Sequence, residues 1–408
     1  MKIRALVTGA LAALVSASAV AADVFTYNVT LLADNSGPFA DLSKRLAARS
    51  AVIQWWNDNE GKKLGVKLNS KTYDTRYDPS VVASIWPGIV SSEKPIVGLG
   101  LGGPDVSALQ ERLPDDKVPV IYSTPGYGYS WTPNSWVFNL RPSYVHEYLG
   151  VLNWFIEKNP EKRPVKIAFI STQQSPAFVD MVRGITKYVD DNLKPKNLAE
   201  IVATEWVPIQ PVDLGSQIQR INAAGADLIF GVANTAMASA AVRAGQLHGV
   251  NIPTVASSWH TIWPVGQAMK SYKAWEGHYV ATGIVPIADN NGAAHAFYQE
   301  LASKYDLPKT WDPLTLLGMS QGIVAVKAIE ATAKRVGADK LTGQAVYETL
   351  TTHKFQEAEL QGFMKGLGYT KDAPFPLSGW IKIVTVKDGE YTLADPEWVP
   401  IPEDVVKW

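Results

Sequence analysis

The sequence predicts an α/β fold made of two Rossmann-like, doubly wound lobes. Short apolar strands alternate along the chain with helices of roughly 10 to 17 residues, a pattern typical of βαβ units and parallel sheets. One such series ends near residues 139–143, and a second begins directly afterwards. A mature chain of about 385 residues also exceeds one typical domain, so two lobes are expected.

The first 22 residues have the features of an export signal. Two basic residues precede an apolar run at 5–15, and small residues follow at the spacing that a signal peptidase accepts. We expect cleavage after Ala21 or Ala22. The apolar run is too short to span a membrane. The mature protein is therefore expected to be soluble in the periplasm.

Composition narrows the possible functions. Without the signal segment, 36 basic residues stand against 39 acidic ones, and no basic tract occurs, which argues against nucleic-acid binding. The chain has no cysteine, so disulfides and thiolate chemistry are excluded. The fold must therefore be stabilised by its core alone.

The first series of elements precedes residue 141. Strands are predicted at 25–33, 66–74, 94–100, 118–123 and 136–140. Helices are predicted at 41–59 and 78–90, with Asp41 and Asp78 as their caps, and a further helix is expected to begin near Pro104.

The second series follows the same alternation. Helices are predicted at 145–159, 177–193, 213–226 and 235–249, and then near 291–304, 313–335 and 342–350. Strands are predicted at 165–171, 201–208, 227–233, 252–258 and 278–286. Asp388 and Gly389 form the expected turn of a C-terminal hairpin.

The loops that follow the strands should form the functional site, since open parallel sheets bind ligands at the carboxyl ends of their strands. These loops are rich in glycine, hydroxyl and aromatic residues and poor in charge, and they lie at 33–40, 98–105, 122–131, 171–178, 233–238 and 257–264. Such a composition favours a binding cleft with apolar walls and a few polar groups. Asp105, one of the few charges, is interpreted mainly as a helix cap.

Catalytic and metal-binding patterns are weak. No loop contains G-x-S-x-G, and the six histidines are far apart. The glycines at 98–103 superficially resemble a dinucleotide fingerprint, but they do not follow the first strand and have no matching acidic partner. His260, between Trp259 and Trp263, lacks an acid beside it that would support a catalytic base. The sequence predicts no enzyme, no cofactor and no metal.

Several loop residues have two interpretations. The hydroxyls of Ser123 and Thr124 either donate to a ligand or form a turn, and Asn234 either contacts a ligand or caps a helix. Trp259 and Trp311 stand in a loop or at a helix start, where contact with a ligand is an alternative to packing. Tryptophans inside helical patterns are interpreted as packing residues: Trp55, Trp56, Trp86 and Trp154.

An ordered set of segments resembles one family. It includes "VTLLADNSGPFADLSKRLAARSAVIQWWNDNEG", "YDTRYDPSVVA", "PIVGLGLGGPDVSAL", "VPVIYSTPG", "VFNLRPS", "KIAFIST", "DLIFGVANTAMASAAVRAGQLHGV" and "WEGHYVATGIVP". Across essentially the whole mature chain, this set resembles the type I periplasmic solute-binding proteins of the branched-chain, or hydrophobic, amino-acid class of ABC transporters. The resemblance implies two lobes joined by three crossover segments, near 141–143, 280–284 and 372–380.

The implied organisation is a signal peptide at 1–22, lobe 1 at 23–141 plus 284–372, and lobe 2 at 142–283 plus 373–408. The resemblance also implies that hydroxyls and backbone N–H groups of lobe 1 hold a ligand carboxylate. On lobe 2, "SSWHT" lacks the acid with which amino-acid binders of this family meet an ammonium group. Since a buried, unpaired ammonium is costly, an aromatic acid is favoured over an amino acid.

We therefore expect a periplasmic binding component of an ABC importer that captures a small apolar, aromatic carboxylate by lobe closure. A branched-chain amino acid, a short amide or another small neutral metabolite is the alternative ligand. The expected partners are this ligand and a membrane ABC permease, and the protein is expected to be a monomer. The expected ligand-binding residues are Ser36, Gly102, Gly103, Ser123, Thr124, Gly126, Tyr127, Asn234, Trp259, His260 and Trp311.

Overall fold

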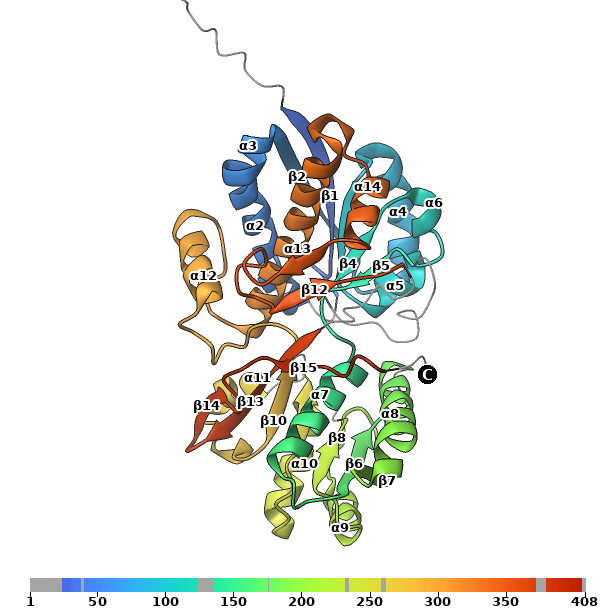
Figure 1. Cartoon of the computed structure of the whole chain (residues 1–408), viewed down its shortest axis with the longest axis vertical. Coiled ribbons are helices and arrows are strands. Elements are labelled where there is room, and N and C mark those ends of the chain that lie inside the picture. The colour runs from blue at the N-terminus through green and yellow to red at the C-terminus, as the bar shows by residue number, and fades with distance from the viewer. Residues whose placement is uncertain are drawn as a thin grey trace, which may run out of the picture.

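The computed structural model describes residues 24–37, 40–123, 135–174, 176–231, 235–257, 262–371 and 379–405. The chain forms two lobes, each with its own hydrophobic core (Figure 1). Core residues of lobe 1 lie within 29–140 and 284–369, and those of lobe 2 lie within 144–281 and 381–405. The chain therefore passes between the lobes three times.

Lobe 1 is built on a sheet of five parallel strands in the order β2-β1-β3-β4-β5. These strands are β1 (Phe25–Ala33), β2 (Val66–Asp74), β3 (Val97–Gly100), β4 (Val120–Tyr122) and β5 (Val137–Asn139). A small hairpin adds β11 (Lys354–Gln356) and β12 (Gly366–Gly368). The helices are α1 (Ala40–Leu46), α2 (Ala48–Trp56), α3 (Lys62–Leu64), α4 (Pro79–Glu93), α5 (Gly103–Leu109), α6 (Leu113–Asp116), α12 (Ala293–Lys304), α13 (Pro313–Val336) and α14 (Gly343–Leu350), with a π-helical turn at Asn57–Gly61 and a 3-10 turn at Ala338–Lys340.

Lobe 2 has a mixed sheet. The parallel strands β7-β6-β8 meet the group β9-β10-β13-β14 through a single bridge between Ile229 and Thr254. The strands are β6 (Val165–Ser171), β7 (Ala199–Trp206), β8 (Leu228–Phe230), β9 (Val255–Ser257), β10 (Tyr279–Thr282), β13 (Trp380–Lys387), β14 (Glu390–Leu393) and β15 (Val399–Pro400). The helices are α7 (Tyr144–Lys158), α8 (Pro176–Tyr188), α9 (Gly215–Ala223), α10 (Thr235–His248) and α11 (Ile262–Met269), with shorter turns at Val189–Leu193, Lys194–Lys196 and Lys273–Trp275.

The predicted α/β class and its two parallel-sheet lobes are confirmed. Asp78 caps α4 by accepting a hydrogen bond from the Ser80 N–H at 2.7 Å, and Asp388 and Gly389 form the two-residue turn between β13 and β14. The single helix expected at 41–59 is wrong in detail, because it is divided into α1, α2 and a π-helical turn. Its first residue is Ala40, so Asp41 does not cap it. The hairpin β11–β12 was not expected.

Helix α13 forms the centre of lobe 1. It is long and apolar enough to span a membrane, but 83% of its most apolar stretch is buried inside the lobe. Two of its glycines let α2 and the end of α1 approach closely. A Cβ on Gly318 would lie 2.8 Å from the Leu46 carbonyl oxygen, and one on Gly322 would lie 3.1 Å from the Arg49 Cα. These small residues bring Gln321, between them, close to the buried Arg49.

Arg49 and Gln321 together hold the carboxyl ends of three strands. The Arg49 guanidinium donates to carbonyl oxygens of β1 and β3 and, at 3.1 Å, to Gln321 Oε1. Gln321 Nε2 donates to carbonyl oxygens of β3 and β4 at 2.8 and 2.7 Å. The accepting carbonyls belong to Leu32, Leu99, Gly100 and Ile121. We call this arrangement the carbonyl clamp, and it fixes the strand ends from which the loops of lobe 1 emerge.

We predict that Gln321→Leu lowers the free energy of unfolding of lobe 1 by about 2–4 kcal/mol. The substitution keeps the side-chain volume but leaves buried carbonyl groups and Arg49 without their partner. Urea denaturation measures the change. The control is Gln110→Leu on the half-buried end of α5, for which we expect less than about 0.5 kcal/mol. Equal changes in the two variants would contradict a role for the clamp.

Candidate functional site

The strands of the two lobes end on facing edges. In lobe 1, β5 ends at Asn139, immediately before the chain crosses to lobe 2, and its parallel neighbours end at the same edge. In lobe 2, β10 ends at Thr282, immediately before the return crossing. The order of the strands reverses between β1 and β3 and again between β6 and β8. Such reversals are where open α/β sheets bind ligands, so the candidate site lies between these edges (Figure 1).

Six of the expected ligand-binding residues lie outside the described residues: Thr124, Gly126, Tyr127, Asn234, Trp259 and His260. Their part in ligand binding stays a prediction. The strands β4, β8 and β9 end just before these residues, at the facing edges.

Ser36 lies in the exposed loop after β1. Its hydroxyl donates to Asp74 Oδ2 at 2.6 Å, and Asp74 Oδ1 accepts from the N–H groups of Asn35 and Arg76 at 2.8 and 3.1 Å. Asp74, the last residue of β2, therefore organises this loop. The Ser36 hydroxyl has its proton in that network and is not free to donate to a ligand.

Ser123 and Gly102 also bond within the protein. The buried Ser123 hydroxyl donates to the Leu101 carbonyl oxygen at 2.7 Å, and the Ser123 N–H donates to the Gly100 carbonyl oxygen at 3.2 Å. The Gly102 N–H donates to the side chain of Asp105. These donors, expected to hold a ligand carboxylate, have partners in the protein. Gly103 is exposed, with no atom within 4 Å of the position that a Cβ would take.

Trp311 packs within lobe 1. Its indole N–H donates to the Ile287 carbonyl oxygen at 3.1 Å, and its ring centre lies 4.9 Å from that of His295 and 5.3 Å from that of Tyr298. This aromatic cluster accounts for Trp311 without a ligand. The residue was expected in the site because it precedes a helix, but its neighbours in α12 are remote in sequence.

Asp105 is not the expected helix cap. Gly102 is the N-cap of α5, and Asp105 lies inside the first turn. Its Oδ2 accepts from the Leu101 N–H at 2.7 Å, while its Oδ1 has no hydrogen-bond partner in the described part of the chain. Burial raises the pKa of Asp105 to about 6, against the opposing effects of the Leu101 and Gly102 N–H groups and the Arg49 charge.

Other buried polar atoms on the facing edges also lack a partner among the described residues. They are Arg141 Nε and Nη2, Ser171 Oγ and Ser257 Oγ. Arg141 follows β5, whereas Ser171 and Ser257 are the last residues of β6 and β9. Buried polar groups are nearly always hydrogen-bonded, so these exceptions on the facing edges call for a partner outside the described residues, such as a ligand or ordered water. Sequence reasoning missed Arg141 and Ser171.

Two tyrosines add aromatic surface at this interface. Tyr77 of lobe 1 has a left-handed backbone (φ 53°), and its pKa is raised by burial and by Tyr144, Asp105 and Asp34. Tyr144 is the first residue of α7, so this electrostatic interaction of Tyr77 reaches lobe 2. The Tyr144 ring stacks on Phe178 with 5.8 Å between centres, and the Arg141 guanidinium lies 5.7 Å from its centre. Arg76 and Tyr77 both have a left-handed backbone, in the turn between β2 and α4.

A direct contact also joins the lobes. The Arg45 guanidinium of α1 lies 5.8 Å from the ring centre of Trp263 in α11. Arg45 also pairs with the buried Asp312 at 3.4 Å. Arg45 is thus oriented by lobe 1 while it faces an aromatic ring of lobe 2, a favourable cation–π arrangement.

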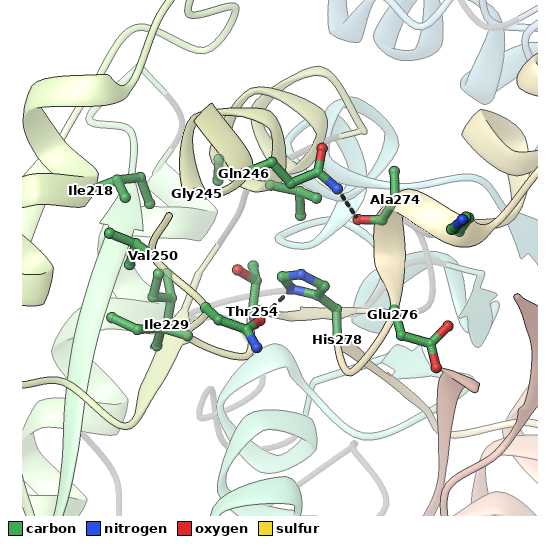
Figure 2. Close-up of a pocket in the computed structure, with 14 residues that line it drawn as sticks. Ile218, Ile229, Gly245, Gln246, Val250, Thr254, Ala274, Glu276 and His278 are labelled. Atoms are coloured by element: carbon green, nitrogen blue, oxygen red, sulfur yellow. Dashed lines mark hydrogen bonds between the residues drawn. The ribbon is translucent and has the colours of Figure 1, made fainter. Parts of the chain in front are cut away.

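A separate hollow of about 160 Å³ lies at the opposite end of lobe 2, where β9 and β10 begin (Figure 2). His278 Nδ1 accepts from the Thr254 N–H at 3.0 Å, and Gln246 Nε2 donates to the Ala274 carbonyl oxygen at 3.2 Å. Burial lowers the pKa of His278 to about 4, so its ring is neutral at pH 7. These contacts support the strand ends, and the hollow is distant from the facing edges of the lobes.

The raised pKa of Asp105 predicts a pH-dependent stability difference. A carboxyl group whose pKa is higher in the folded state stabilises the fold while it is protonated, and that stabilisation is lost as pH rises from about 4 to about 6. Asp105→Asn should therefore gain unfolding free energy relative to the wild type by up to about 3 kcal/mol between pH 4 and pH 7. Urea denaturation across this range measures the difference. The exposed Asp115→Asn serves as the control, and a gain of the same size there would contradict the assignment.

Comparisons with solved structures show the same fold. A branched-chain amino acid ABC transporter protein from Thermus thermophilus with bound valine matches with a TM-score of 0.75 and 18% identity, covering 94% of this chain and 98% of the other. A solute-binding protein from Rhodopseudomonas palustris in complex with 4-hydroxybenzoate matches with a TM-score of 0.70 and 16% identity, covering 93% and 99%. A fatty acid ABC transporter substrate-binding protein from Thermomonospora curvata matches with a TM-score of 0.70 and 17% identity, covering 93% of each chain.

The family comparison extends over most of the chain. No curated protein matches the sequence. The family model described as "Periplasmic binding protein" matches residues 26–375, which include both lobes and their crossings. This range agrees with two parallel-sheet lobes whose strand ends face each other. The chain therefore belongs to the periplasmic binding protein family, whose members are solute-binding components of ABC transporters.

Proposed function

We propose that this protein captures a small, largely apolar solute between its lobes, with an aromatic carboxylate as the favoured class, and delivers it to a membrane ABC permease. The unpaired polar atoms on the facing edges carry the proposal, because one ligand between the lobes would contact groups from both. Capture followed by lobe closure needs no bond-making chemistry. The protein is accordingly proposed to be a binder and not an enzyme.

Arg141 is the proposed partner of the ligand carboxylate. Its Nη1 is paired with Glu147, and both side chains are fully buried. Nε and Nη2 lack a hydrogen-bond partner among the described residues, although the Tyr144 hydroxyl lies under the influence of this guanidinium. They form the other edge of the guanidinium, whose two parallel N–H bonds match the geometry of a carboxylate. This assignment replaces the expectation that lobe 1 holds the carboxylate, where the donors of Gly102 and Ser123 already have partners.

The aromatic character of the ligand is supported by the rings beside Arg141. Tyr144 stacks on Phe178, and Tyr77 approaches from the other lobe. Each aromatic pair contributes about 0.5–1.5 kcal/mol beyond the burial of area. One solved structure of the same fold holds 4-hydroxybenzoate. A short amide or other neutral solute is the second candidate, because the buried carboxylate of Asp105 disfavours an anion on lobe 1.

The cellular location of the protein and its division into lobes are also proposed from its family. Periplasmic binding proteins of ABC importers are exported, and we propose that a signal peptide is removed after Ala21 or Ala22. The mature protein is proposed to act as a monomer with lobe 1 at 23–141 plus 284–372 and lobe 2 at 142–283 plus 373–408. The separate hydrophobic cores of the two lobes support this division.

The first prediction concerns ligand class. At 1 mM, 4-hydroxybenzoate or benzoate should raise the melting temperature of the protein, since a ligand present at 100 times its dissociation constant stabilises the fold by about 2.7 kcal/mol. Differential scanning fluorimetry with aromatic acids, leucine, valine and short amides measures this shift. A shift with leucine or valine alone would rule out the aromatic proposal, and a shift with amides alone would favour the second candidate.

The second prediction concerns Tyr77. Tyr77→Ala should weaken binding of the aromatic ligand about tenfold, because it removes a ring at the interface while keeping a Cβ on the same left-handed backbone. Isothermal titration calorimetry measures the dissociation constant. The matched control is Tyr73→Ala on β2, whose hydroxyl donates to Glu93 at the end of α4. If both variants bind as tightly as the wild type, Tyr77 does not contact the ligand.

A further inference from the structure

One oxygen of the Asp105 carboxylate has no hydrogen-bond partner among the described residues, although the N–H groups of Leu101 and Gly102 both act on this carboxylate. Its side chain has no solvent exposure, and Oδ2 takes the hydrogen bond from the Leu101 N–H. Oδ1 has no partner in the part of the chain that the structure describes. A buried acceptor without a donor is costly, by about 1–3 kcal/mol and more for a charged group. Such an atom therefore requires an explanation.

Arg49 does not supply the missing donor. It is the cation whose charge acts on Asp105. Its hydrogen bonds, however, go to two strand carbonyls and to Gln321 within the carbonyl clamp. The nearby positive charge opposes the burial that raises the pKa of Asp105, but Arg49 gives no hydrogen bond to Oδ1. The clamp holds Arg49 of α2 in place, since α13 packs closely against α2 at Gly322.

The surroundings of Asp105 place it at the interface of the lobes. It follows β3, one of the two strands between which the strand order reverses. The charge of Asp34, which directly follows β1, helps to raise the pKa of Asp105. The charge of Asp105 also acts on Tyr77, which in turn interacts with Tyr144 of lobe 2. This chain of neighbours runs from Asp105 across the interface to the aromatic residues of the proposed site.

We propose that Asp105 accepts a hydrogen bond from the ligand, so that the ligand presents a hydroxyl or amide donor to lobe 1. This inference rests on the proposed function and refines it. A ligand carboxylate at this position would face a second carboxylate, whereas a phenol or amide N–H supplies the donor that Oδ1 lacks. The solute is thus oriented, with its donor end at Asp105 and its acid end at Arg141.

The test compares ligands that differ only in the donor. Isothermal titration calorimetry of the full-length mature protein at pH 7.5 should give a dissociation constant for 4-hydroxybenzoate at least about tenfold lower than those for benzoate and 4-fluorobenzoate. A site built to bond a hydroxyl group rejects analogues that lack it. Because this comparison uses the wild type, it does not depend on the folding of any variant.

Asp105→Asn provides the matched variant. The amide NH₂ group that replaces Oδ1 donates a hydrogen bond where the carboxylate accepted one. The ratio of the dissociation constants of benzoate and 4-hydroxybenzoate should therefore fall to less than threefold. Benzoate itself should bind this variant at least as tightly as the wild type. Asp115→Asn, in the same lobe and exposed, should keep the wild-type ratio. The melting temperature of each unliganded variant verifies that it is folded.

The outcomes separate this inference from the proposed function. Equal binding of hydroxylated and unhydroxylated acids by the wild type overturns the role of Asp105 and leaves the aromatic-acid proposal standing. An unchanged ratio in a folded Asp105→Asn protein also overturns that role. If no aromatic acid binds the wild type, the proposed ligand class fails and the inference fails with it.

Discussion

The hydrogen bonds at the carboxyl edge of the lobe 1 sheet are the constraint on which the rest of the site depends. Near their carboxyl ends, β1, β3 and β4 present buried carbonyl groups to the helices α2 and α13. Arg49 and Gln321 supply the donors from two helices that pack closely through Gly318 and Gly322. Burial lowers the pKa of Arg49 to about 10, which leaves it cationic at pH 7.

The carbonyl groups at the strand ends accept hydrogen bonds from Arg49 and Gln321 within the protein. The buried polar atoms that have no partner among the described residues therefore mark the candidate site. Donors that a family resemblance would give to a ligand, on Gly102 and Ser123, bond to Asp105 and Leu101 instead. Among the described residues, the buried polar atoms without a partner include an acceptor on lobe 1, a guanidinium edge at the first crossing and two hydroxyls on lobe 2. Tyr144, stacked on Phe178, adds aromatic surface beside the guanidinium.

Sequence reasoning recovered the fold more fully than the site. The alternation of strands and helices is a local signal, so nearly all elements and the edge that carries the loops were predictable. Asp105 was interpreted as a cap because it stands near the start of a helix, and its bond to the Leu101 N–H is indeed local. Its proximity to the charge of Arg49, on a helix remote in sequence, is what no local pattern reveals. Trp311 was expected in the site because of its loop position, although its partners lie in α12. No sequence pattern pointed to Arg141. Its interest lies in Nε and Nη2, which lack a partner among the described residues while Glu147 pairs with Nη1, and this arrangement is visible only in the structure.

If Arg141 binds the ligand as proposed, its position couples binding to closure of the lobes. It lies on the first crossing, where its side chain is bonded to α7 of lobe 2, whereas Asp105 belongs to lobe 1. A ligand that bonds only one of them leaves the other buried and unpaired, so the full binding energy is available only when both lobes enclose it. Arg45 of lobe 1 meets Trp263 of lobe 2 in the same arrangement. Under the proposed mode of binding, the same few residues determine both ligand polarity and lobe closure. A solute with a donor at one end and an acid at the other should then stabilise the closed form more than a solute with only one of these groups.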